Sequence, residues 1–360
     1  MSDKRGNYAI LIYMGEFGQT RSVGTIFDTE LFRRDVRRDV RNCALFLFFF
    51  YAVYLIASII VMALVMLFGD AFQNLMTDPE ALLNIVSDGG LSGAGGQDLT
   101  DTVTDMMERA TGPMSIAGIV AGGCVFFILR KRRFITDIAA PAFEQLTPKI
   151  CVILVLVTQA IQYVYGLIVS LIDELLPEGI SLLDSYGSVM EGLFTPIGIL
   201  YIVLIGPVFE ELIFRGAVMG SLRRFGDNFA ILFSALFFGF YHAIVLQIPF
   251  GFLMGLLFGY AAGRWSLRVS IALHIIVNGL SMLFSISGSE DFTNAVSIIM
   301  LACTALTVIF AIKWRKILRL RFRAGSAYYP GTYRNGFSSI AFWVFIVVMS
   351  GFGLFQMTAM

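Results

Sequence analysis

The sequence predicts an all-α fold, a polytopic transmembrane helical bundle of about nine spans, and three observations support this prediction. Of the 360 residues, 57% are hydrophobic and only 14% are charged, whereas soluble domains average about 25% charged residues. The mean hydropathy is +0.79. Apolar runs long enough to cross about 30 Å of hydrocarbon also recur along the chain. Together these observations indicate an integral membrane protein rather than a soluble domain.

Lysine and arginine placement predicts the orientation of the spans. Of the 26 basic residues, 25 fall in the N-terminal segment and the alternate loops that follow it, and Arg109 alone falls on the other side. The N-terminus is therefore expected in the cytoplasm and the C-terminus outside. The expected spans lie near residues 44–68, 113–129, 150–173, 192–214, 228–247, 249–263, 267–286, 293–313 and 338–357.

The spans and loops divide the chain into four expected regions. In the first region, the basic stretch 31–42 predicts an amphipathic helix lying on the cytoplasmic membrane surface. In the second, the glycine-rich centre of an acidic stretch predicts an external loop. The regions are residues 1–43, a cytoplasmic N-terminal segment; 44–189, the first transmembrane helices with the external loop 69–112; 190–290, a transmembrane core; and 291–360, the last transmembrane helices.

The net charge and the spacing of the cysteines limit the classes of partner that we expect. The zero net charge argues against a nucleic-acid partner, so the expected partners are the lipid bilayer and a protein or peptide substrate that the sequence does not identify. The four cysteines are scattered with no CxxC spacing, which predicts small buried hydrophobes rather than a disulfide or metal framework. No organelle signal is visible, and we expect a multi-pass protein of a bacterial plasma membrane.

Charged residues in the stretch GPVFEELIFRG, Gly206–Gly216, stand out because charge is costly at membrane depth. Glu211 and Arg215 are four residues apart with the acid first, so on an α-helix they lie on one face and neutralise each other. Glu210 lies about 100° around such a helix from Glu211. The spacing therefore predicts one ion pair and one carboxylate that needs another partner or a function.

The two histidines of the chain lie in two further spans. Phe238 and His242 are four residues apart in one span, and His274 and Asn278 are four apart in another. Counting from Arg223, Asn228 and Arg264 at the cytoplasmic ends, Glu210 and His242 lie about 20 Å deep and His274 about 15 Å deep. The polar side chains of three helices are thus expected to converge on one cavity within the membrane.

A carboxylate, two imidazoles and a carboxamide suit hydrolysis of an amide bond. The carboxylate takes a proton from water, one imidazole orients that water, and the other imidazole with the Asn N–H stabilises the oxyanion. Glu210, His242 and His274 are also a ligand set for Zn²⁺ with an open water position. The sequence leaves both the metal-dependent and the metal-free chemistry open.

Structural readings of the same residues are also open. Glu211 and Arg215 are equally compatible with a purely structural pair, an intramembrane histidine or asparagine often serves as interhelical glue, and Phe238 fits simple packing. A non-catalytic membrane immunity or scaffold protein, or a transporter, could retain the whole cluster. The absence of internal repeats and broken-helix signals argues against a transporter.

Three motifs together resemble the CPBP intramembrane proteases, the CAAX prenyl endopeptidase and bacteriocin-processing family. Its pattern of EExxxR, FxxxH and HxxxN on successive membrane helices is matched by EELIFR from Glu210, by FGFYH from Phe238 and by HIIVN from His274. Each motif alone is weak, but the ordered set in an apolar context is specific. The resemblance covers about residues 190–290.

The resemblance implies an intramembrane endopeptidase in which Glu210 and His242 activate water. It implies an oxyanion hole formed by His274 and Asn278, with Glu211, Arg215 and Phe238 in support. Members have been described both as metalloproteases and as glutamate-dependent proteases, so zinc use stays open. Eukaryotic members trim prenylated CAAX proteins, an activity that we do not expect in a bacterial membrane.

Overall fold

The computed structural model describes residues 29–68, 94–130, 144–177, 180–286, 290–324 and 331–358, and within these residues all regular structure is helical. This confirms the all-α prediction. The elements are α2 (Thr29–Phe68), α5 (Ala94–Arg130), α7 (Pro148–Glu174), α8 (Leu182–Glu191), α9 (Pro196–Leu200), η2 (Tyr201–Ile205), α10 (Gly206–Glu211), η3 (Leu212–Met219), α11 (Gly220–Leu222), η4 (Arg223–Phe225), α12 (Asp227–Tyr241), α13 (Gln247–Arg264), α14 (Leu267–Ile286), α15 (Glu290–Ala324), α16 (Thr332–Phe337) and α17 (Ile340–Thr358).

Within the described part of the chain, five helical segments are long and apolar enough to cross a membrane. Six of the nine predicted spans fall within single helices, whereas 192–214, 228–247 and 338–357 also include residues between helices. The number of crossings and the orientation of the termini stay predictions. Large apolar side chains such as Ile298 and Leu171 point outward along these segments, as expected for surfaces that face lipid. The segments are Glu30–Phe68, Pro148–Glu174, Pro196–Phe225, Leu267–Ser285 and Asp291–Arg315, with two shorter apolar helices at Asp227–Tyr241 and Ile340–Gln356.

Helix α2 contains the predicted amphipathic helix at 31–42, and its position relative to a membrane stays a prediction. The basic stretch continues without a break into the first apolar run. Its apolar residues Phe32, Val36 and Val40 recur every four positions and are buried, and Phe32 packs edge-on against Phe225 at 5.6 Å between ring centroids. The apolar face of this stretch therefore packs against the bundle.

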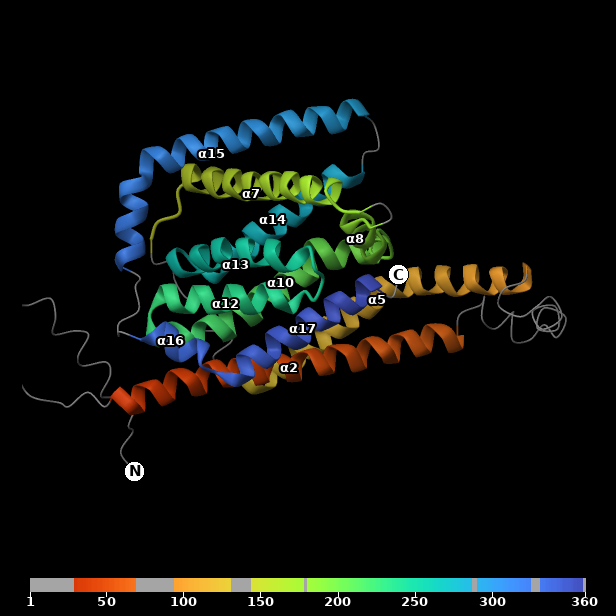
Figure 1. Ribbon diagram of the computed structural model, residues 1–360, viewed down its shortest axis with the longest axis horizontal. Coiled ribbons are helices and arrows are strands. Elements are labelled where there is room, and N and C mark those ends of the chain that lie inside the picture. The colour runs from red at the N-terminus through yellow and green to blue at the C-terminus, as the bar shows by residue number, and fades with distance from the viewer. Residues whose placement is uncertain are drawn as a thin grey trace, which may run out of the picture.

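Helix α5 corrects the predicted external loop at 69–112. Residues 94–112 form the first half of a continuous 37-residue helix, while residues 69–93 lie outside the described part of the chain. The glycines of this helix allow close packing, because a Cβ at Gly118 would lie 2.6 Å from the Tyr54 ring and one at Gly122 would lie 2.5 Å from Phe50. Helices α2 and α5 consequently form a tight pair (Figure 1).

Ion pairs at one end of the bundle connect helix ends that are far apart in sequence. Arg224 binds Asp39 at 2.5 Å, Arg264 binds Glu144 at 3.2 Å, and the Arg37 guanidinium donates to Ser338 at 3.1 Å. The beginnings of α2, α7 and α12 lie at this end in Figure 1. Loops predicted to share the cytoplasmic side thus meet in space, which supports the predicted grouping of basic residues.

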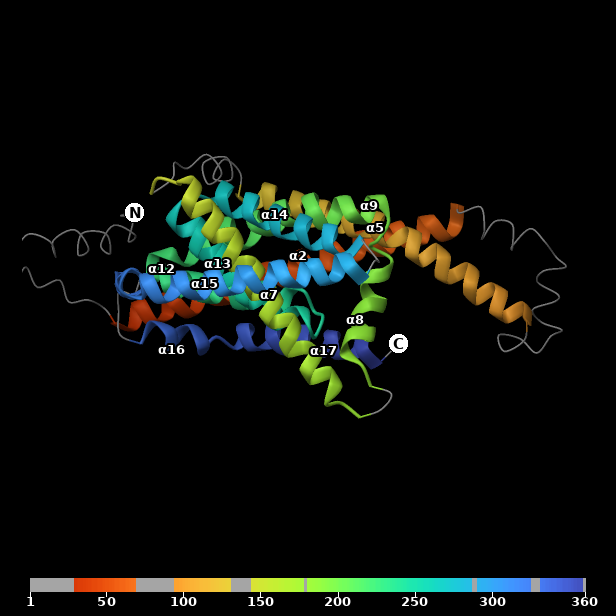
Figure 2. The ribbon, with the colours of Figure 1, turned by 90° about the horizontal axis from the view of Figure 1, so that it is seen from above.

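The segment from α9 to η4 runs through the middle of the molecule and carries the glutamates. It is surrounded by α2 and α5 on one side and by α12, α13 and α14 on the other, while α7 and α15 pair beyond α13 and α14 (Figures 1 and 2). Phenylalanines fill the space between α12 and α17, with Phe237 packed edge-on against both Phe342 and Phe345.

Two of the four cysteines, Cys124 and Cys151, are exposed, so the prediction of buried cysteines was wrong for these two.

Candidate active site

Glu210, Glu211 and Arg215 lie on a segment that is not a regular α-helix. The short helix α10 is placed between two π-helical turns, η2 and η3. In η2 the N–H of Gly206 donates to the carbonyl of Tyr201, five residues back, and the next residue, Pro207, has no N–H to continue the pattern. The assumption of a continuous α-helix through this motif was therefore wrong, and π-helical turns are frequent at functional sites.

The predicted ion pair between Glu211 and Arg215 is present. Arg215 Nη1 lies 2.9 Å from Glu211 Oε1, and both side chains are 0% exposed. Arg215 Nη2 also donates to the Gly255 carbonyl at 3.2 Å. The guanidinium lies 4.3 Å from the centroid of the Phe238 ring, so Phe238 covers the cation with its face and supports the pair as the resemblance implied.

Glu211 is also bound by two groups on helix α14. Ser270 Oγ donates to Glu211 Oε2 at 2.5 Å, and His274 Nδ1 contacts Glu211 Oε1 at 3.1 Å. The sequence analysis missed Ser270, although Ser270, His274 and Asn278 recur every four residues and so share one face of the helix. That spacing was the available signal for Ser270.

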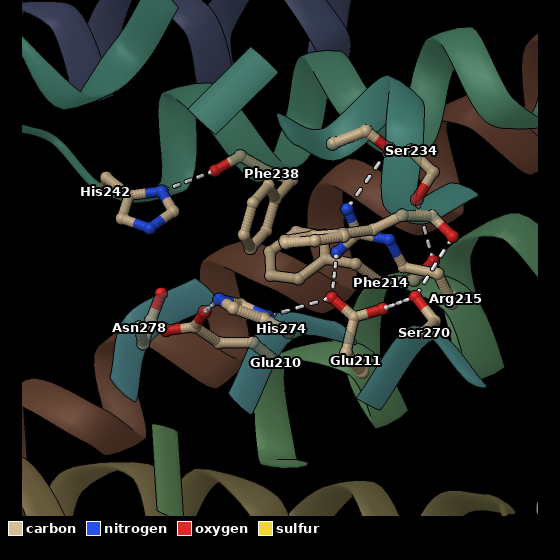
Figure 3. A network of polar contacts seen from close by, with 12 residues as sticks. Glu210, Glu211, Phe214, Arg215, Ser234, Phe238, His242, Ser270, His274 and Asn278 are labelled. Atoms are coloured by element: carbon tan, nitrogen blue, oxygen red, sulfur yellow. Dashed lines mark hydrogen bonds and ion pairs between the residues drawn. The ribbon is translucent and has the colours of Figure 1, made fainter. Parts of the chain in front are cut away.

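Glu210 faces the same imidazole from the other side. Its Oε2 lies 3.8 Å from His274 Nε2, and 11% of its side chain is exposed, compared with 6% for His274. Figure 3 shows His274 between the two neighbouring carboxylates. The position of Glu210 beside His274 agrees with the expected convergence of these side chains. The contact of Glu211 with the other nitrogen of the same imidazole was not predicted.

His242 ends helix α12 and has one ring nitrogen free. Its Nδ1 lies 2.8 Å from the Phe238 carbonyl. A carbonyl only accepts hydrogen bonds, so Nδ1 carries the hydrogen and Nε2 of a neutral ring is an acceptor. Figure 3 shows Nε2 turned toward the side where Glu210 and His274 lie.

The turn after His242 is held in an unusual backbone conformation. Ala243 has φ 50°, a left-handed value that costs energy for a residue with a Cβ. Close packing fixes this turn, because a Cβ at Gly251 would lie 3.2 Å from His242 Nδ1 and one at Gly353 would lie 2.9 Å from the Ala243 carbonyl oxygen. Strained residues that the surrounding structure enforces are typical of functional sites.

Asn278 binds a carbonyl that Pro207 leaves without a donor. Its Nδ2 donates to the Ile202 carbonyl at 2.9 Å, and in the π-helical pattern that carbonyl would accept from the missing N–H of residue 207. One of the two amide hydrogens of Asn278 is thus engaged in the scaffold, and the second is free for another acceptor. The structure gives Asn278 a packing function that the sequence analysis named only as a general alternative.

The predicted zinc ligands do not assemble into a metal site in this arrangement. Over the residues that the structure describes, no three His, Cys, Asp or Glu side chains are grouped closely enough to hold a metal ion. His274 Nδ1 is committed to Glu211, and its Nε2 is 3.8 Å from Glu210. We therefore derive no chemical step through a metal from this geometry.

This geometry defines a polar site of two carboxylates and two imidazoles inside an apolar helical bundle. Comparison with known proteins finds a family model that is similar to this region. Residues 192–280 match the family model described as type II CAAX prenyl endopeptidase Rce1-like, which confirms the resemblance seen in the motifs. The matched region contains every motif residue from Glu210 to Asn278.

A curated relative supports the same comparison. The chain is 32% identical over 109 residues to the membrane-embedded CAAX protease MroQ of Staphylococcus aureus (strain USA300). The match covers 28% of this chain and 44% of the relative, so it spans less than half of either protein. No solved structure matches the chain. The apolar helices and this relative together identify an integral membrane protein.

Proposed function

We propose that this protein is an intramembrane endopeptidase that hydrolyses a peptide bond of a membrane-associated protein or peptide. The observation that carries the proposal is the arrangement in Figure 3, in which His242 Nε2 is turned toward the side of Glu210 and His274, and Glu210 lies 3.8 Å from His274 Nε2. The site lies among apolar helices, where water is scarce and electrostatic interactions are strong. The family match at residues 192–280 supports a protease.

In the proposed mechanism, Glu210 is the general base. It is the site carboxylate with exposed surface, whereas Glu211 is fully enclosed by its partners. A water molecule between Glu210 and His242 would donate one hydrogen to the carboxylate and the other to His242 Nε2. A lone pair of the water oxygen would then attack the carbonyl carbon of the substrate while Glu210 takes a proton from the water. That proton would pass from Glu210 to the leaving amine.

His274 and Asn278 are proposed to stabilise the oxyanion. Because His274 Nδ1 donates to Glu211, Nε2 carries a hydrogen only when the ring is an imidazolium. An imidazolium would also bring the total charge of Glu210, Glu211, Arg215 and His274 to zero, which favours burial of the cluster. The free amide hydrogen of Asn278 would supply the second donor.

The proposed substrate is an apolar peptide segment in or at a bacterial plasma membrane. The curated relative is a bacterial protein named as a CAAX protease, so C-terminal CAAX peptides belong among the probes. We propose that a prenyl group is not required, because the expected membrane is bacterial. Zinc dependence stays an untested expectation, and the zinc content of the purified protein and of His242→Ala would measure it directly.

A cleavage assay in liposomes tests the proposal. Purified protein would be incubated with farnesylated CAAX peptides and with unlipidated membrane-inserted peptides, and products would be identified by mass spectrometry. We expect cleavage by the wild type and a loss of about 100-fold or more in Glu210→Gln and His242→Ala, since each removes a proton-transfer group.

Glu191→Gln is the matched control for charge removal, because Glu191 is exposed at the end of α8. Its cleavage rate should equal that of the wild type. Wild-type rates in both Glu210→Gln and His242→Ala would reject the proposal and favour a non-catalytic immunity or scaffold protein.

A further inference from the structure

A pocket lies beside the turn that follows His242 and joins α12 to α13. The turn forms one wall, and helix α8 and the last part of α17 form the others. Figure 1 shows α8 and the C-terminal end of α17 on the same side of the molecule. Both of these helices lie outside residues 192–280, the region that matches the protease family. Residues that line the pocket include Ser185 and Tyr186 from α8, Ile244, Val245 and Leu246 from the turn, and Gln356 from α17.

The backbone of the turn has donors without acceptors. Among the described residues, none accepts a hydrogen bond from the N–H groups of Ile244, Val245 or Leu246. Two carbonyls of the same turn are occupied, because that of Ile244 accepts from two N–H groups at the start of α13 and that of Leu246 accepts from Tyr165 Oη at 2.6 Å. A ligand of this turn would therefore need to supply acceptors.

Another wall of the pocket has an acceptor without a donor. The carboxamide oxygen of Gln356 is buried, and nothing in the described part of the chain donates to it. A peptide backbone carries both carbonyl acceptors and N–H donors, whereas the acyl esters of a lipid carry acceptors alone. Leu182 adds an apolar side chain to those of the turn. The pocket thus suits an apolar stretch of peptide better than a lipid.

The expected depth of the turn makes free N–H groups costly unless water or a ligand meets them. Helix α12 has 15 residues and is about 22 Å long, which is less than about 30 Å of hydrocarbon. The basic residues predict that α12 begins at the cytoplasmic surface, so its far end is expected within the apolar layer. Irregular backbone at such depth occurs where protein covers it or where it lines a water-filled cavity.

We infer that this pocket binds the backbone of an extended, apolar peptide segment beside His242. Carbonyls of the peptide accept from the N–H groups of the turn, one peptide N–H donates to the Gln356 oxygen, and an apolar side chain enters the pocket. A helical segment cannot bind in this way, because its own N–H and carbonyl groups are already paired. The inference rests on the proposed function only where it makes this peptide the substrate.

Ser185→Phe and Ser188→Phe form a matched pair for a binding test. Both serines lie on α8 and donate to the carbonyl four residues back, but Ser185 lines the pocket and Ser188 is exposed. The protein would carry Glu210→Gln to block the proposed cleavage, and fluorescence anisotropy would measure its binding of a labelled leucine-rich peptide in liposomes. Ser185→Phe should raise Kd about tenfold or more because its ring fills the pocket, and Ser188→Phe should change Kd by less than about twofold. Equal Kd values in the two variants, or no saturable binding, would overturn the inference.

Methylation of one peptide nitrogen at a time tests the bond to Gln356. In the same Glu210→Gln protein, methylation at one position should raise Kd about fivefold, the effect of losing one neutral hydrogen bond. Gln356→Met should raise Kd by the same factor for the unmodified peptide. The two changes should not add, because both remove the same bond. Additive effects at every position contradict the inferred bond.

Cleavage kinetics separate the binding site from the proposed function. With a peptide that the wild type cleaves, Ser185→Phe and Gln356→Met should raise KM and leave kcat within about twofold. If the wild type cleaves no peptide but the two serine variants differ in Kd, the proposed function fails and the binding site stands. If the wild type cleaves peptides and neither variant changes Kd or KM, the binding site fails and the proposed function stands.

Discussion

Glu211 and Glu210 are neighbours in sequence, yet their surroundings differ sharply. The Glu211 carboxylate is bound by Arg215, Ser270 and His274, and its side chain is 0% exposed. The Glu210 side chain is 11% exposed, and its closest ionic partner is 3.8 Å away. Figure 3 shows both carboxylates on either side of His274.

This difference separates a structural charge from a reactive one. A buried carboxylate that accepts from three enclosed partners contributes to the fold and is closed to water. A partly exposed carboxylate in the same apolar layer keeps its lone pairs available for water. His274 connects the two, because Glu211 fixes the ring through Nδ1 and thereby points Nε2 toward Glu210 and the substrate.

The largest effect on stability is expected when the cation that pairs with Glu211 is removed. Arg215→Leu leaves Glu211 buried without its cation, so we expect the free energy of unfolding to fall by about 3–5 kcal/mol. Glu210→Gln should change it by less, about 1 kcal/mol, because the Glu210 side chain is partly exposed and its ionic partner His274 is 3.8 Å away. Detergent-induced unfolding in mixed micelles measures both values.

The control for this prediction is the double variant Arg215→Leu with Glu211→Gln. It removes the unpaired charge, so it should recover part of the lost stability. Equal destabilisation by Arg215→Leu and Glu210→Gln would show that the two glutamates are not divided into structural and reactive roles.

The sequence allowed the pairing within each helix to be predicted, but only part of the contacts between helices. The spacing of Glu211 and Arg215 was sufficient to predict their ion pair because both residues lie on one short segment. The expected convergence of Glu210 with the two histidines agrees with the structure, in which His274 Nε2 lies 3.8 Å from Glu210 and the His242 ring is turned toward the same side in Figure 3. Helical spacing identifies a face, and apolar context places that face within the membrane.

Features that depend on tertiary packing could not be predicted in the same way. The π-helical turns around α10 depend on Pro207 and on a distant donor, Asn278, that satisfies the free carbonyl. The contact between Ser270 and Glu211 requires α14 to face α10 in one rotation, and spacing within α14 does not specify its neighbour.

An intermediate effect is expected from the Ser270 contact. Ser270→Ala removes a hydrogen bond to a buried charge, and we expect a loss of about 1–2 kcal/mol in the free energy of unfolding. Ser281→Ala on the same helix is the matched control, because Ser281 bonds the neutral Gln162 at 2.9 Å. It should cost about 0.6 kcal/mol, the average for hydrogen bonds between membrane helices. A larger loss at Ser281 than at Ser270 would contradict the special role of the Glu211 network.

The smallest effect on stability is expected at Asn278. This residue donates to the Ile202 carbonyl and is also proposed to stabilise the oxyanion. Asn278→Ala leaves the Ile202 carbonyl without its donor and should lower the free energy of unfolding by about 1 kcal/mol. Pro207→Ala restores a backbone N–H at the position where the π-helical pattern calls for one, so the double variant should regain that stability. Peptide cleavage should stay low in the double variant, because the second amide hydrogen of Asn278 is still missing from the oxyanion site. Recovery of both stability and cleavage would show that Asn278 serves only to satisfy the carbonyl left free by Pro207.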